Sequence, residues 1–161
     1  MNRPVGTRPP DERKRGAAWV AAQSVLLLAL VASGPLRPGD WHSPAGLAVG
    51  AVLFLAAGFI GVAGVLNLGG NRTPFPAPRP GSTLVRSGVY RWCRHPLYTS
   101  VMLAGFSWAL LWQGAWTLGL AAIQVPFFVA KARAEERLLR RAFPDYEAYA
   151  RQVKAFLPGV F

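Results

Sequence analysis

Residues 96–130 read PLYTSVMLAGFSWALLWQGAWTLGLAAIQVPFFVA, and these 35 residues include no charged side chain. As a single helix they would extend about 52 Å, too long for one ordinary membrane crossing, which takes about 20 residues. Gln113-Gly114 interrupts the stretch near its middle. The stretch therefore predicts a tight helical hairpin, with transmembrane helices at residues 97–112 and 116–130.

Two earlier stretches, residues 17–36 and 45–68, also lack charged side chains and are long enough to cross a bilayer. The first has a basic lead-in like that of a signal peptide, but no clean small-residue cleavage site follows, so we expect a retained helix. Glycines in the second recur at spacings of three and four, which predicts close packing against another helix. The fold class predicted is an all-α integral membrane protein with four transmembrane helices.

The basic residues set the expected topology. The chain has 18 Lys and Arg against 7 Asp and Glu, for a net charge of +11, and 17 of the 18 lie in residues 1–16, 69–95 and 131–161. Four crossings place all three blocks on one side, which the positive-inside rule makes cytoplasmic. We therefore expect a single domain in the cytoplasmic (inner) membrane, with both termini cytoplasmic. Its basic tail would span residues 1–15, and its cytoplasmic segments residues 69–96 and 131–161 would form the site.

Composition excludes several classes of protein. Charged residues make up 16% of the chain, below the usual share in soluble domains, and the basic residues form blocks apart from the apolar ones. A nucleic-acid partner is therefore not expected, and the exposed arginines suit anionic lipid headgroups instead. Cys93 and His95 have no third or fourth ligand near them in sequence, so no metal site is expected. The sequence carries no signal for the oligomeric state.

The segment before residue 96 is dense in hydrogen-bonding and aromatic groups. Pro96 suits the first turn of a helix, whose opening N–H groups have no partner inside the helix and would attract a carboxylate ligand. An alternative stays open, in which Arg91 and Arg94 bind lipid headgroups and the neighbouring aromatic residues anchor the interface.

The fourth helix is expected to continue past residue 130, where Glu135 and Glu136 lie on or beside its apolar stripe. Burying a carboxylate without a partner is costly, so each needs a cation or a hydrogen-bond donor. Glu136 has a local partner in Arg140, four residues on. The other possibility is a ligand that carries a positive charge or several hydroxyl groups.

These motifs together resemble a known family. LVRSGVY at residues 84–90, RHPLY at 94–98, the acidic pair, the spaced aromatics Phe143, Tyr146 and Tyr149, and the Leu157-Pro158 ending are similar to the signature of the isoprenylcysteine carboxyl methyltransferases. Phospholipid N-methyltransferases are related membrane enzymes with a similar pattern. The resemblance covers roughly residues 69–161.

The resemblance implies a methyltransferase that uses S-adenosylmethionine as cofactor without a Rossmann domain and methylates a lipophilic acceptor from the bilayer. The cofactor-binding residues that it implies are Thr83, Leu84, Val85, Tyr90, His95, Pro96, Leu97, Tyr98, Glu135 and Glu136. It also implies that a basic residue steers the acceptor, which here would be Lys131, with Arg133 close by.

The acceptor stays open between a prenylated thiol-peptide, a phospholipid amine and a lipophilic small molecule. A carboxylate acceptor would need no general base, whereas an amine would need one to remove a proton. A competing hypothesis from another class is a non-catalytic membrane scaffold or lipid-binding subunit. A transporter is disfavoured because the expected spans carry no ionisable residue at mid-depth.

Overall fold

The computed structural model describes residues 10–71, 73 and 81–156, and all the regular structure in them is helical. The alternating prolines of residues 74–80, the Leu157-Pro158 ending and the first part of the basic tail lie outside the described residues. The predicted all-α class is confirmed.

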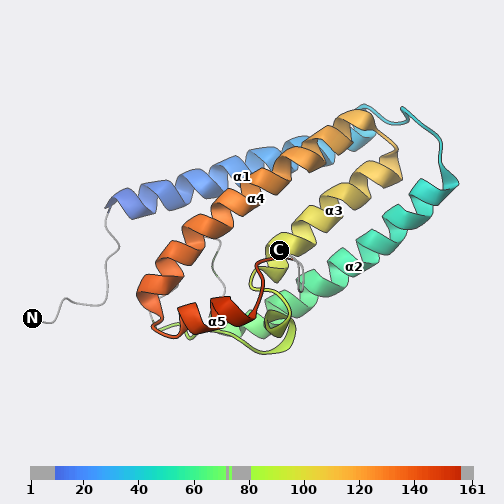
Figure 1. Cartoon of the computed structure of the whole chain (residues 1–161). Coiled ribbons are helices and arrows are strands. Elements are labelled where there is room, and N and C mark those ends of the chain that lie inside the picture. The colour runs from blue at the N-terminus through green and yellow to red at the C-terminus, as the bar shows by residue number, and fades with distance from the viewer. Residues whose placement is uncertain (1–9, 72, 74–80, 157–161) are drawn as a thin grey trace, which may run out of the picture.

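Four long helices coincide with the hydrophobic stretches of the sequence (Figure 1). They are α1 (Pro10–Leu36), α2 (Pro44–Leu68), α3 (Pro96–Trp112) and α4 (Ala115–Ala142). Three of them, α1, α2 and α4, are long and apolar enough to cross a membrane. Helix α3 carries no charged residue but has 17 residues, slightly fewer than the about 20 that a membrane crossing usually takes. The fourth crossing therefore stays a prediction.

The hairpin between α3 and α4 turns within two residues, at the place where the sequence predicted it. Gln113 adopts the left-handed conformation (φ 52°, ψ 38°) that ends many helices. Its side-chain oxygen accepts a hydrogen bond from the Ser43 amide at 3.3 Å, and its side-chain nitrogen donates to the Ser43 carbonyl at 3.0 Å. This one glutamine therefore joins the hairpin to the loop between α1 and α2.

Small residues let α2 pack closely on α3, as the glycine spacing predicted. A Cβ atom on Gly61 would lie 2.6 Å from Ser100 Oγ, and one on Gly64 would lie 2.8 Å from a methyl carbon of Leu97. The close approach also lets Ser100 Oγ donate a hydrogen bond to the Ala57 carbonyl at 2.7 Å. Gly58 meets nothing within 4 Å, so its face of α2 does not share in this packing.

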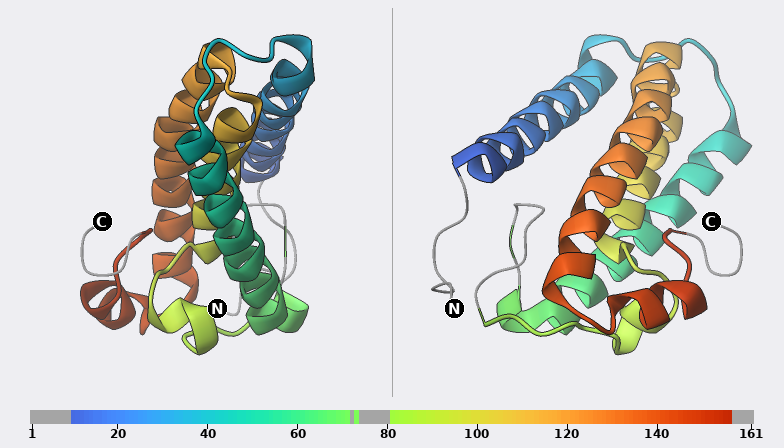
Figure 2. Two further views of the ribbon diagram at one scale, coloured as in Figure 1. Left: turned by 90° about the vertical axis from the view of Figure 1, so that its right-hand side faces the viewer. Right: turned by 60° about the vertical axis from the view of Figure 1, so that its left-hand side comes forward.

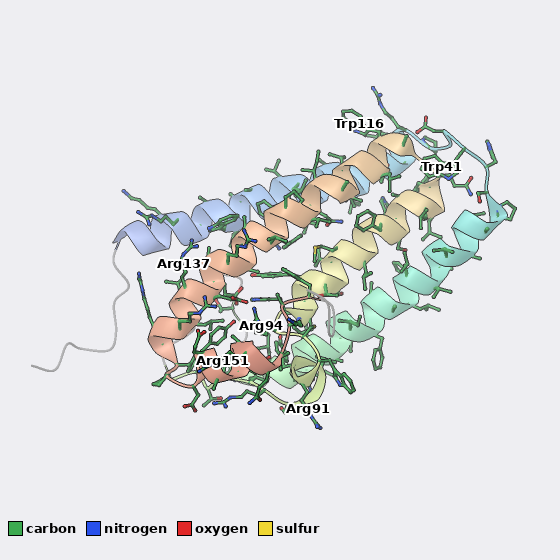
Figure 3. All side chains as sticks on the ribbon, in the orientation of Figure 1. Trp41, Arg91, Arg94, Trp116, Arg137 and Arg151 are labelled. Atoms are coloured by element: carbon green, nitrogen blue, oxygen red, sulfur yellow. The ribbon has the colours of Figure 1, made fainter. Side chains whose placement is uncertain are left out.

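The shorter elements gather at the end of the bundle opposite the hairpin turn (Figures 1 and 2). They are η1 (Gly69–Asn71), η2 (Gly88–Arg91) and α5 (Tyr146–Gln152). Figure 3 shows that the labelled arginines lie toward this end, whereas Trp41 and Trp116 lie at the hairpin end. Helix α1 diverges from the other three toward its N-terminus (Figure 2, right).

Candidate functional site

A cavity of about 480 Å³ lies among α2, α3, α4 and the loop that precedes α3. This volume is in the range of small-molecule binding sites. Eight of the ten predicted cofactor residues line it, namely Thr83, Leu84, Val85, Tyr90, His95, Leu97, Tyr98 and Glu135. Lys131 lines it too. Pro96 and Glu136 do not line it, although both are buried.

Two asparagines, Asn67 near the end of α2 and Asn71 at the end of η1, hold the loop in place over the cavity. Asn71 Oδ1 accepts a hydrogen bond from the Thr83 amide at 3.1 Å, and Asn67 Oδ1 accepts one from the Val89 amide at 2.9 Å. Gly88 has φ +59°, and a Cβ there would lie 2.0 Å from Asn67 Oδ1, so the loop needs glycine at this position. Sequence reasoning missed both asparagines, because their partners lie 12 and 22 residues away.

Glu136 belongs to an internal ion-pair network instead of the cavity lining. Its Oε1 accepts hydrogen bonds from Arg94 Nε at 2.9 Å and Nη2 at 2.7 Å, and lies 3.0 Å from His95 Nε2. Its Oε2 accepts one from Arg140 at 3.3 Å, which confirms the predicted local pair. With both oxygens engaged, Glu136 has little capacity left for a ligand.

Arg94 is the cation at the centre of this network. Its side chain is only 12% exposed, and besides Glu136 it donates to the backbone carbonyls of Ala150, at 2.9 Å, and Val153. The alternative that Arg94 binds lipid headgroups is therefore wrong. The backbone adds to the same junction, since the His95 amide donates to the Ala155 carbonyl at 2.9 Å. Arg94 thus ties α4 and the C-terminal segment to the start of α3.

Glu135, by contrast, is available to a ligand. Tyr98 donates its hydroxyl hydrogen to Glu135 Oε2 at 2.6 Å, and the Tyr98 ring stacks on His95 with centroids 5.4 Å apart. Among the described residues, no hydrogen bond reaches the other carboxylate oxygen of Glu135. The predicted need for a partner is therefore met at one oxygen, and the second can accept a hydrogen bond from a bound molecule.

Tyr146 contributes a buried hydroxyl that the sequence-based ligand set omitted. The residue is 1% exposed and lines the cavity, and its hydroxyl has no hydrogen-bond partner in the described part of the chain. Burial, together with the negative charge of Glu136, raises the pKa of Tyr146, so the group stays protonated. A buried hydroxyl without a partner is costly, so a bound molecule is expected to satisfy it. In the sequence, only the spacing of the aromatic residues around Tyr146 pointed to this residue as part of the site.

Lys131 is 2% exposed and lies between α1 and α3. Its ammonium donates a hydrogen bond to Gln23 Oε1 on α1 and lies 5.4 Å from the centroid of the Tyr98 ring, a cation–π contact. Gln23 also lines the cavity, which no sequence pattern indicated. Arg133 is exposed and does not line the cavity. Of the two basic residues predicted to steer the acceptor, only Lys131 therefore lies at the cavity.

The fold and the site define a class: a helical protein with three helices long and apolar enough to cross a membrane, and a mixed polar and aromatic cavity at the more charged end of the bundle. The chain belongs to the phospholipid methyltransferase family, whose model matches residues 45–146. That match confirms the predicted similarity to phospholipid methyltransferases. The matched region begins after α1, which ends at Leu36.

Two relatives extend the similarity to nearly the whole chain. The cobalt-zinc-cadmium resistance protein CzcN of Cupriavidus metallidurans is 33% identical over 91% of this chain. The nickel-cobalt-cadmium resistance protein NccN of Alcaligenes xylosoxydans xylosoxydans is 34% identical over 91%. The chain spans 64% and 65% of the lengths of these two proteins.

Proposed function

We propose that this protein is an S-adenosylmethionine-dependent methyltransferase that methylates a lipophilic acceptor at the cytoplasmic face of the inner membrane. The observation that carries the proposal is the convergence of the loop before α3, the start of α3 and the α4 acid on one cavity of about 480 Å³. Membership of a methyltransferase family supports the type of reaction.

The cavity residues fit the groups of S-adenosylmethionine. The free oxygen of Glu135 suits the ammonium or the ribose hydroxyls, and the orphaned Tyr146 hydroxyl suits a further polar group. The first-turn N–H groups of α3 have no partner inside the helix and suit the carboxylate. The ring of Tyr98 at the cavity wall suits the sulfonium cation.

When bound, S-adenosylmethionine supplies a methyl group whose bond to the positively charged sulfur breaks, with its electron pair staying on sulfur, as the acceptor nucleophile bonds to the methyl carbon. The protein residues bind the cofactor and the acceptor, align them and exclude water from the site. This suffices for methyl transfer because the leaving group is already activated. Gly61, Val65 and Val101 give the cavity an apolar side suited to a lipophilic acceptor.

For the topology we propose four crossings with both termini in the cytoplasm. Support comes from the exposed Arg91, Arg137 and Arg151, which lie toward the cavity end of the bundle, and from Trp41 and Trp116 at the other end (Figure 3). Arginines near the membrane surface attract anionic lipid headgroups, and tryptophans concentrate at the interface.

Calorimetric titration of the purified full chain with S-adenosylmethionine tests the proposal. We expect saturable binding by wild type and a loss of about 10- to 100-fold in Glu135→Gln, because a hydrogen bond to a charged group contributes about 1.5–3 kcal/mol. Glu147→Gln is the matched control, since Glu147 is exposed and lies outside the cavity. Folded wild type that binds none would overturn the proposal in favour of a membrane scaffold.

A further inference from the structure

Helix α1 diverges from α4 in its N-terminal part and leaves a wedge between the two helices (Figure 2, right). Toward the hairpin end they stay joined, since Ser33 donates a hydrogen bond to Thr117 at 2.9 Å. Trp19 still packs edge-on against Phe127, with ring centroids 5.4 Å apart. Among the described residues, no hydrogen bond, ion pair or ring contact joins residues 14–18 of α1 to α4. The wedge therefore begins beside Trp19 and widens toward the start of α1.

Helix α4 keeps the side that faces α1 apolar beyond the point where α1 has diverged. Phe127 and Lys131 on this side contact α1. Ala134 and Leu138 follow Phe127 by seven and eleven residues and so continue the same side of the helix. Both are only half-buried. The wedge therefore has an apolar floor that α1 leaves partly uncovered.

Two arginines of α4 border this floor. Arg137 follows Ala134 by three residues and therefore lies beside it, and Arg133 lies one turn before Arg137. Both arginines are exposed, and like charges four residues apart on a helix repel one another. In the described part of the chain, neither arginine forms an ion pair with a carboxylate. The border of the wedge is therefore positively charged and not neutralised by the described side chains.

The acids near this end of the bundle have other partners. Residues 11–15 of α1 read DERKR, with three basic and two acidic residues, so α1 brings no net negative charge to the wedge. The acids described on α4 and beyond it are each engaged elsewhere, namely Glu135 by Tyr98, Glu136 by Arg94 and Arg140, Asp145 by Arg86, and Glu147 by Arg140.

The length of α4 places its arginines at a suitable depth for a lipid headgroup. The helix has 28 residues and carries no charged side chain before Lys131. At 1.5 Å per residue it extends about 42 Å, whereas the hydrocarbon core of a bilayer is about 30 Å thick. Its last turns, which carry Arg137, therefore extend beyond the hydrocarbon core to the level of the phosphates.

We propose that the wedge binds one anionic phospholipid of the surrounding bilayer. An acyl chain packs on Ala134 and Leu138, and the phosphate of the headgroup pairs with Arg137 and Arg133. The lipid holds the N-terminal part of α1 against α4, and α1 lies outside the region that the family model matches. None of these four residues lines the cavity of about 480 Å³, so the lipid is separate from the methyl acceptor, and the inference does not rest on the proposed function.

Native mass spectrometry of the full chain tests the proposal. The protein is equilibrated in detergent micelles that contain equal amounts of phosphatidylglycerol and phosphatidylcholine with identical acyl chains. We expect wild type to retain one phospholipid and to prefer phosphatidylglycerol about tenfold or more, because each arginine near the membrane surface strengthens anionic-lipid binding about fivefold. Equal retention of the two lipids, retention of neither, or a second copy of the chain in place of the lipid would overturn the proposal.

A pair of charge variants separates the wedge from a general surface attraction. Arg137→Gln should lower the preference for phosphatidylglycerol about fivefold. Arg151→Gln is the matched control, because Arg151 is exposed, lies on α5 and likewise forms no ion pair with a described carboxylate. Equal losses in the two variants would mean that any exposed arginine attracts the lipid, and the proposed site would be wrong.

A pair of packing variants tests the apolar floor without changing charge. Ala134→Trp fills the wedge and should lower lipid retention at least as much as Arg137→Gln does. Ala142→Trp adds the same side chain at the exposed last residue of α4 and should retain the lipid as wild type does. Circular dichroism in lipid-free detergent checks that both variants are folded. A folded Ala134→Trp variant with wild-type retention would overturn the proposal, since the lipid would then not occupy the wedge.

Discussion

Arg94→Met should open the end of the helical bundle that holds the cavity, and Cys93 beside it provides the probe. The substitution removes two hydrogen bonds to Glu136, at 2.9 and 2.7 Å, and the donors to the carbonyls of Ala150 and Val153. Both partners of the ion pair are largely buried, with side chains 12% and 8% exposed. The C-terminal segment then loses its main side-chain tie to the start of α3.

The magnitude follows from the remaining partners. Removing one member of a buried ion pair costs about 3–5 kcal/mol. Glu136 keeps His95 and Arg140, so we take the lower end, about 3 kcal/mol. If opening and closing are fast compared with labelling, this raises the open population, and with it the labelling rate of Cys93, roughly 150-fold.

A thiol-reactive fluorogenic maleimide measures that rate, because Cys93 is the chain's one cysteine and is 6% exposed. Arg86→Met is the matched control: it also removes an arginine from an ion pair, with Asp145, but the two side chains are 45% and 71% exposed. Exposed pairs contribute about 1 kcal/mol or less, so the control should label at most about fivefold faster than wild type. Arg94→Met labelling no faster than the control would refute the role assigned to the network.

Two further predictions concern the thiol and the helix packing. Burial raises the pKa of Cys93 above its usual 9.0, so the fold gains stability from the neutral thiol below pH 9 and loses that stability as the pH rises further. The melting temperature should therefore fall between pH 9 and 10 more steeply in wild type than in Cys93→Ser. Parallel melting curves for the two proteins would contradict this prediction. Gly105→Ala should destabilise by about 1–3 kcal/mol in a thermal melt, because its Cβ would lie 1.7 Å from the side-chain nitrogen of the fully buried Gln124. Gly119→Ala, where a Cβ meets nothing within 4 Å, should be neutral or slightly stabilising, so equal effects of the two substitutions would argue against close packing of α3 on α4.

The four long helices and the hairpin could be predicted from sequence because their causes are local. A run of some twenty apolar residues determines where a helix can cross a membrane, and the Gln113-Gly114 break determines where the long run turns back. The candidate cavity residues came from the family resemblance, and eight of the ten lie together in the structure.

The division of roles among the charged residues depended on tertiary structure. Glu135 and Glu136 are adjacent in sequence, but successive residues of a helix point about 100° apart, so they meet different neighbours. One faces Tyr98 and the cavity, while the other meets Arg94, which lies 42 residues earlier. Gln23 reaches Lys131 across 108 residues and from a helix that no motif connects to the site. Apolar runs therefore determined the helices, whereas contacts between distant segments decided which polar groups are already paired and which are left for a ligand.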